Sequence, residues 1–222
     1  MFFSTFRRQL VALAHALASE LTKIVTLSFV LGSKAAYFSL GQCFAPLVGA
    51  WATPGLTFII HLIRSVWTCL YLGVGVYISS VYHVPTFCGA LYLSSHSRLI
   101  RIGIPLVCMV AFIGHPVGNQ VFLYSFYWLI PIAIAYRNST SFFLRSLGST
   151  FTTHAVGSVI WLYTRAVPVS VWYNLIGIVW IERLMFACAM TLIYTTVSQA
   201  IILWRSNRYK NTIKHTFNSI GA

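Results

Sequence analysis

Apolar residues in this chain are grouped into long runs, and short polar or basic breaks separate one run from the next. A helix that crosses a bilayer needs about 20 consecutive, mostly apolar residues. Runs of this length predict membrane-spanning helices, six or seven in number, with one of them short or broken. The expected segments cover roughly residues 9–32, 36–52, 56–81, 102–114, 121–136, the hairpin 145–183 and a last helix over 177–204.

The segment over residues 36–52 is expected to be irregular. It is marginal for a full crossing, since about 20 residues are typical, and Pro46 lies inside it. Gly41, Ala45 and Gly49 recur at four-residue intervals, a spacing that lets helices approach closely. We therefore expect a short, kinked or re-entrant helix with a close-packing stripe.

Two further stretches are expected to interrupt the helices. Residues 114–120 read GHPVGNQ, which combines two glycines, a proline and three hydrogen-bonding side chains. Non-helical backbone at membrane depth is tolerated only where protein or water satisfies its polar groups. Residues 83–97, which contain Pro85 and Gly89, are also expected to be irregular.

The composition favours a membrane-embedded chain of the all-α class. Only 8% of its 222 residues are charged and 58% are hydrophobic, whereas a soluble domain carries about 25% charged residues. These few charges are insufficient to cover a water-facing surface, and no stretch of soluble-domain size is left between the apolar runs. We expect a single integral membrane domain over residues 1–222, folded as a polytopic helical bundle.

The net charge of +13 follows the positive-inside rule rather than the pattern of a nucleic-acid-binding surface. Basic residues lie singly between apolar runs and gather at the two ends, where Arg7 and Arg8 precede the first run and residues 205–222 form a short basic tail. Both termini are therefore expected in the cytoplasm, which favours an even number of crossings, six. The expected location is a bacterial plasma (inner) membrane, with the lipid bilayer as a partner and no nucleic acid.

The chain lacks the residue types and motifs that most catalytic sites need. The chain has no Asp and only two Glu, Glu20 and Glu182, which excludes a paired-carboxylate site, and no nucleotide-binding motif is present. The five cysteines show no CxxC pairing and no metal-ligand spacing, so neither a disulfide framework nor a metal site is expected. We expect no enzymatic activity and no cofactor.

The hairpin over residues 145–183 carries groups that a lipid-facing helix avoids. Five of its side chains recur at helical spacing and would share one face: Thr150, His154, Ser158, Trp161 and Arg165. A charge at the centre of a membrane helix costs roughly 2.5–3.5 kcal/mol, so such groups should face other helices or a wet cavity. We interpret the hairpin as one wall of a ligand site. The candidate ligand-binding residues are His154, Ser158, Trp161, Asn174 and Glu182, with His115 and Asn119, near Tyr124 and Trp128, as a second wall.

The charged side chains of the hairpin need partners. Glu182 and Arg183 are adjacent and point about 100° apart on a helix, so each is expected to find its own partner elsewhere. Arg64 and Arg145 are the alternatives for Glu182.

The first segment has a charge pair and a small-residue pattern. Glu20 and Lys23 are three residues apart and can pair on one face. Ala12 and Ala16 have the small-xxx-small spacing of closely packed membrane helices. This spacing serves either packing inside the protein or docking of another membrane subunit.

Several stretches resemble the small substrate-binding (S) components of energy-coupling factor vitamin transporters. The run FSLGQCFAPLVGAWATPGLTFIIHLI resembles their second and third segments, and PTFCGA at residues 85–90 is similar to a loop of the biotin-specific members. FIGHPVG, YSFYWLIPI, RSLGSTFTTHAVGSVIWLYT and WIERLMFA resemble an uncharacterised S-component-like family of bacterial and archaeal membrane proteins. The resemblance implies a six-helix bundle that binds a micronutrient at its outer face. It also implies docking on a transmembrane coupling subunit through Ala12 and Ala16 or through Ala14 and Ala18, with transport driven by ATPase subunits.

Three functions remain as expectations. The first is a membrane-embedded substrate-binding subunit for uptake of a small metabolite or vitamin-like micronutrient, in which Glu182→Gln and His154→Ala each weaken ligand binding. The second is a stand-alone proton-coupled secondary transporter, with Glu182 or His154 carrying the proton. The third is a structural membrane protein without a ligand.

Overall fold

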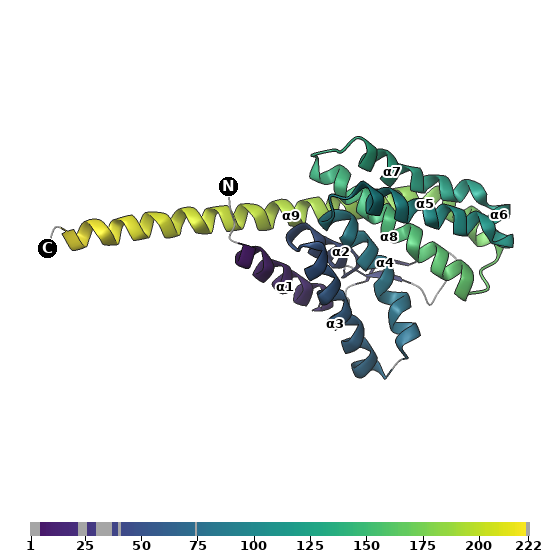
Figure 1. Ribbon diagram of the computed structural model, residues 1–222, viewed down its shortest axis with the longest axis horizontal. Coiled ribbons are helices and arrows are strands. Elements are labelled where there is room, and N and C mark those ends of the chain that lie inside the picture. Colours follow the sequence, from purple (N-terminus) through teal and green to yellow (C-terminus); the bar gives the residue numbers. More distant parts are fainter. Residues whose placement is uncertain (1–4, 22–25, 30–36, 40, 74, 221–222) are drawn as a thin grey trace.

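The structure is a computed structural model that describes residues 5–21, 26–29, 37–39, 41–73 and 75–220 (Figure 1). The described residues confirm the expected helical architecture, with one short antiparallel strand pair as the exception. The elements are α1 (Thr5–Leu21), β1 (Thr26–Phe29), β2 (Tyr37–Ser39), α2 (Gly41–Trp51), α3 (Pro54–Leu72), α4 (Val76–Ser94), α5 (Arg98–Gly114), α6 (Pro116–Gln120), the 3-10 helix η2 (Phe122–Trp128), α7 (Leu129–Tyr136), α8 (Phe142–Thr164) and α9 (Val169–Ile220).

Among the described helices, only α9 is long and apolar enough by itself to cross a membrane, over Val169–Trp204. Its 52 residues correspond to about 78 Å at about 1.5 Å per residue, and Figure 1 shows it extending far beyond the other helices. The expected start near residue 177 is wrong, and the helix continues past residue 204, so residues 205–220 of the predicted basic tail are helical. The helix begins directly after Pro168, because the residue before a proline disfavours helical backbone, and no later proline ends it.

The first half of the chain differs from the expected segments. The first helix ends at Leu21 instead of near residue 32, and Thr26–Phe29 forms a strand, consistent with its β-branched and aromatic residues. The expected helix over 56–81 is divided into α3 and α4. Gly73 caps α3 in the left-handed region, at φ 61°, which glycine adopts without steric cost.

The stretch that was expected to be irregular, residues 83–97, is helical as far as Ser94. Pro85 lies inside α4 without ending it. The helix is held by its packing against α8, where Ser149 donates a hydrogen bond to the Gly89 carbonyl at 2.7 Å and Arg145 donates one to the Leu93 carbonyl. Tertiary contacts therefore override the local helix-breaking signal.

Two expected irregularities are confirmed. Helix α2 has only 11 residues, about 16 Å, which is too short to cross a bilayer, although Pro46 does not interrupt it. Helix α5 ends at Gly114, and the chain continues through the short α6 into η2. The segment expected as one helix over 121–136 is therefore a 3-10 helix followed by the short α7.

Helices α5, α7, α8 and the first part of α9 pack around an aromatic core together with η2. Phe112, Tyr124, Trp128 and Trp172 meet there, with ring centroids 5.2–6.2 Å apart. The chain reverses direction at each connection, so this bundle has two ends. We call the end where α5 and α8 begin the basic end, and the end that holds α6 and the α8–α9 loop the break end (Figure 1).

Candidate functional site

A largely buried polar cluster lies where η2 contacts α8. The Tyr124 hydroxyl is 2.7 Å from His154 Nε2 and 3.3 Å from Ser158 Oγ, and Ser158 Oγ is 3.4 Å from His154 Nε2. His154 and Ser158 are four residues apart on α8 and therefore share a face, while η2 supplies Tyr124. Phe112 and Trp172 cover the Tyr124 ring.

The ion pair of α9 lies beside this cluster. Arg183 is buried, and its guanidinium is 3.6 Å from the Glu182 carboxylate and 4.5 Å from the centre of the Phe186 ring. The charge of Arg183 acts on both Tyr124 and His154. The interior of the bundle therefore holds ionisable groups from η2, α8 and α9.

The expected ion-pair partners are wrong. Glu182 pairs with its neighbour Arg183, because two long side chains 100° apart on a helix can bend toward each other. Arg64 pairs instead with Glu20, at 2.5 Å, and Arg145 donates to a backbone carbonyl. Lys23, the expected partner of Glu20, lies outside the described residues.

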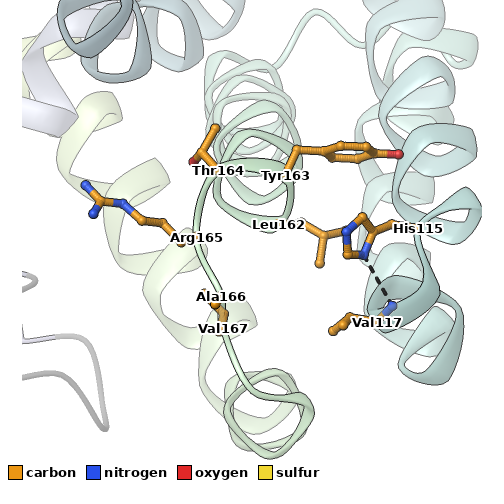
Figure 2. A pocket seen from close by; sticks show the side chains of 8 residues that line it. All are labelled: His115, Val117, Leu162, Tyr163, Thr164, Arg165, Ala166 and Val167. Atoms are coloured by element: carbon orange, nitrogen blue, oxygen red, sulfur yellow. Dashed lines mark hydrogen bonds between the residues drawn. The ribbon is translucent and has the colours of Figure 1, made fainter.

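A cavity of about 320 Å³ lies at the break end, between the α5–α6 junction and the α8–α9 loop (Figure 2). Val117 donates its backbone N–H to Nδ1 of His115 at 3.2 Å, and the His115 ring contacts Tyr163. Figure 2 shows that the guanidinium of Arg165 points away from His115. The lining residues are His115, Val117, Leu162, Tyr163, Thr164, Arg165, Ala166 and Val167.

The candidate residues are thus divided among three places. His154 and Ser158 meet in the polar cluster, Glu182 lies in the ion pair, and His115 lines the cavity. Asn119, Asn174 and Trp161 are exposed and lie in none of the three.

Trp161 is 41% exposed because it follows Ser158 by three residues, whereas the next buried position of α8 follows Ser158 by four. Leu162, four residues after Ser158, turns toward the core in its place. Leu162 and Ala166 also line the cavity, although the sequence analysis did not select them. Their apolar side chains carry no chemical signal, and only the loop geometry brings them to the cavity.

The side chains of Ala12 and Ala16 are buried within the protein. Ala12 is 0% exposed and both alanines pack in one cluster with Val48 and Trp51 of α2. Of the two roles expected for this spacing, packing within the protein agrees with their burial, whereas a free docking face does not.

Removing the Tyr124 hydroxyl should weaken the fold measurably. Tyr124→Phe leaves His154 Nε2 with the longer Ser158 contact alone, so the free energy of unfolding should fall by about 1–3 kcal/mol. Unfolding of the detergent-solubilised protein measures this change. Tyr136→Phe, at a 73% exposed tyrosine of α7, is the matched control and should change it by less than about 0.5 kcal/mol. Equal effects of the two variants would contradict the cluster.

Among the described residues, no three His, Cys, Asp or Glu side chains gather closely enough to hold a metal ion. Cys69, Cys88, Cys108 and Cys188 are free thiols. No protein-family model, curated protein or solved structure matches the chain. Its function therefore has to be argued from the geometry of the cluster, the ion pair and the cavity.

Proposed function

We propose that this chain is a multi-pass membrane protein that captures a small metabolite in the break-end cavity, as the substrate-binding subunit of an uptake system. The cavity carries this proposal, because its volume of about 320 Å³ lies within the range of small-molecule sites, roughly 300–1,000 Å³. Its walls combine the apolar side chains of Val117, Leu162, Ala166 and Val167 with polar groups, which come from His115, Tyr163, Thr164 and Arg165. Polar groups beside apolar walls can orient a small ligand.

The surface of the helices supports the membrane placement. Large apolar side chains are exposed along several helices, and a water-facing protein does not expose patches of this extent. Examples are Leu62, Ile63 and Trp67 on α3, Val107 and Val110 on α5, and Met185 and Leu192 on α9. In the proposed topology α3, α4, α5, the η2–α7 segment, α8 and α9 cross the bilayer, and the short α2 does not.

The charges define the orientation in this proposal. Arg98, Arg101, Arg137 and Arg145 lie where α5 and α8 begin and α7 ends, and the basic part of α9 projects on the same side. The loop at the break end carries Arg165 alone between α8 and α9. By the positive-inside rule the basic end faces the cytoplasm. The cavity then opens toward the outside, as uptake requires.

Cysteine labelling tests this orientation. In a variant without native cysteines, Ala166→Cys at the break end should react with a membrane-impermeant maleimide added to intact cells. Thr140→Cys in the α7–α8 loop should react only after the membrane is permeabilised, because α8 separates the two positions. Both residues are exposed in the structure, so burial does not bias the comparison. Reaction of both in intact cells would exclude a crossing by α8.

Filling the cavity tests the capture function. A small molecule should co-purify with the protein, and mass spectrometry should detect it. Ala166→Trp places an indole in the cavity and should lower its amount at least about tenfold, which corresponds to about 1.4 kcal/mol. Ala133→Trp, at an exposed position of α7, is the control and should retain the molecule. If both variants retain the small molecule equally, it binds outside this cavity. If no small molecule co-purifies with the native protein, the capture function is contradicted.

The partners of such a subunit would be a transmembrane coupling subunit and ATPase subunits. Because Ala12 and Ala16 are covered by α2, a coupling subunit would meet the other face of α1. Leu13, Leu17 and Leu21 are exposed there. Co-purification of such subunits from the native membrane, lost on Leu17→Glu, would identify this face.

A stand-alone proton-coupled transporter is the second candidate. The observation that favours it is the placement of Glu182 and Arg183 beside His154, since ionisable groups inside a helical bundle can relay protons. Liposomes that contain only this chain would then accumulate a substrate in response to a proton gradient. Under the first candidate they would bind the substrate without accumulating it.

A further inference from the structure

Two arginines at the basic end lie beside the last turn of α4. Arg101 is only 5% exposed, and its guanidinium carbon is 4.6 Å from the centre of the Tyr92 ring. Arg145 is half-buried and donates a hydrogen bond from Nη2 to the Leu93 carbonyl at 2.7 Å. The two positive charges also act on each other. Helices α5 and α8 thus bring two guanidinium groups to Tyr92 and Leu93, which are consecutive residues of α4.

Arg101 lacks hydrogen-bond acceptors for much of its guanidinium. Its Nε and Nη2 atoms are buried and have no hydrogen-bond partner in the part of the chain that the structure describes. A buried charge without compensating partners costs several kcal/mol. The Tyr92 ring face offsets a part of this cost, because the electron-rich face of an aromatic ring attracts a cation.

The sequence contains no side-chain carboxylate to complete the site. Glu20 and Glu182 are the two acidic residues of the whole chain. Glu20 contacts Arg64 at 2.5 Å and Glu182 contacts Arg183 at 3.6 Å. Neither of these carboxylates is therefore placed at Arg101 and Arg145.

We propose that Arg101 and Arg145 bind the phosphate of an anionic phospholipid headgroup. A guanidinium presents its N–H donors in a planar fork that matches two phosphate oxygens, and a pair of them suits a single phosphate. Arg145 is only half-buried, so the headgroup reaches the pair from the basic end. A small shift of the Arg101 side chain then turns its Nε and Nη2 toward the same phosphate.

The level of the pair distinguishes a lipid from a soluble phosphate. Arg101 and Arg145 lie at the basic end, which is the level of the cytoplasmic headgroups in the proposed orientation, and the inference rests on that orientation. The side of α5 that is turned away from Arg101 carries the exposed Leu99, Leu106, Val107 and Val110, so this helix borders lipid in the same orientation. A lipid headgroup is therefore already present at the level of the pair, whereas a free phosphate has to come from the water.

The test is native mass spectrometry of the full-length protein released from a neutral detergent. The protein is titrated separately with phosphatidylglycerol, phosphatidylcholine and inorganic phosphate. Phosphatidylglycerol should bind about tenfold more tightly than phosphatidylcholine, and Arg145→Gln should remove this preference. Arg101→Lys is used because a buried Arg101→Gln variant can fail to fold. It keeps the charge but not the planar fork, and it should weaken phosphatidylglycerol binding several-fold.

Arg98→Gln is the matched control, because it removes the same charge from an exposed position one turn before Arg101. It should leave the preference intact. Equal loss in Arg98→Gln and Arg145→Gln would overturn the site in favour of a general surface charge. Inorganic phosphate that binds as tightly as phosphatidylglycerol would overturn the lipid source in favour of a soluble anion. Neither outcome depends on the break-end cavity, so Ala166→Trp should bind phosphatidylglycerol normally.

Discussion

Gly49→Ala is expected to prevent the native packing of α2 against α4. A Cβ atom at position 49 would lie 2.0 Å from the Ala90 carbonyl oxygen, 2.7 Å from its carbon and 2.9 Å from its Cα. All three are backbone atoms, so no side-chain rotation relieves the overlap. Overpacking of a core typically costs about 1–3 kcal/mol, and we expect the upper part of this range or loss of the folded protein.

Gly103→Ala is the matched control for this prediction. Gly103 lies inside α5, and nothing is within 4 Å of a Cβ atom built there. Alanine favours a helix over glycine by about 1 kcal/mol, so this variant should be as stable as the native protein or slightly more stable. Thermal unfolding of both variants in detergent, followed by circular dichroism, compares them. A Gly49→Ala protein with native stability would contradict the close approach of α2 and α4.

Arg64→Leu is expected to cause the second large loss of stability. Arg64 is buried on α3 and its Nε atom lies 2.5 Å from the Glu20 carboxylate of α1. Removing one member of a buried ion pair costs about 3–5 kcal/mol, because the remaining charge loses a close countercharge. Glu20 is 30% exposed and keeps some hydration, so we expect about 3 kcal/mol, the lower limit of this range.

A double variant separates the charge effect from lost packing. Glu20→Gln combined with Arg64→Leu removes both charges and should recover most of the stability that Arg64→Leu loses. Arg98→Leu, which makes the same substitution at an exposed position, should be nearly neutral. The free energies of unfolding of the native protein, Glu20→Gln, Arg64→Leu and the double variant form a thermodynamic cycle. Strict additivity of the two substitutions would mean that the α1–α3 contact contributes no pairing energy.

The sequence determined those features of the fold that depend on neighbours along the chain. The break at residues 114–120 follows from Gly114 and Pro116, which end one helix and start the next. The shared face of His154 and Ser158 follows from their spacing of four residues. Gly73 and Gly75 also indicate a turn between α3 and α4, but the continuous apolar run around them predicted a single helix.

Only the tertiary structure decided which side chains meet across helices. The spacing that pairs His154 with Ser158 says nothing about Tyr124, because the phase of one helix does not fix the rotation and height of its neighbour. For the same reason Glu20 meets Arg64, 44 residues away, and Arg101 is buried beside Tyr92. Local spacing sets the direction of a side chain within its own helix. Close packing between helices, as at Gly49 and Ala90, sets the register that determines its partner.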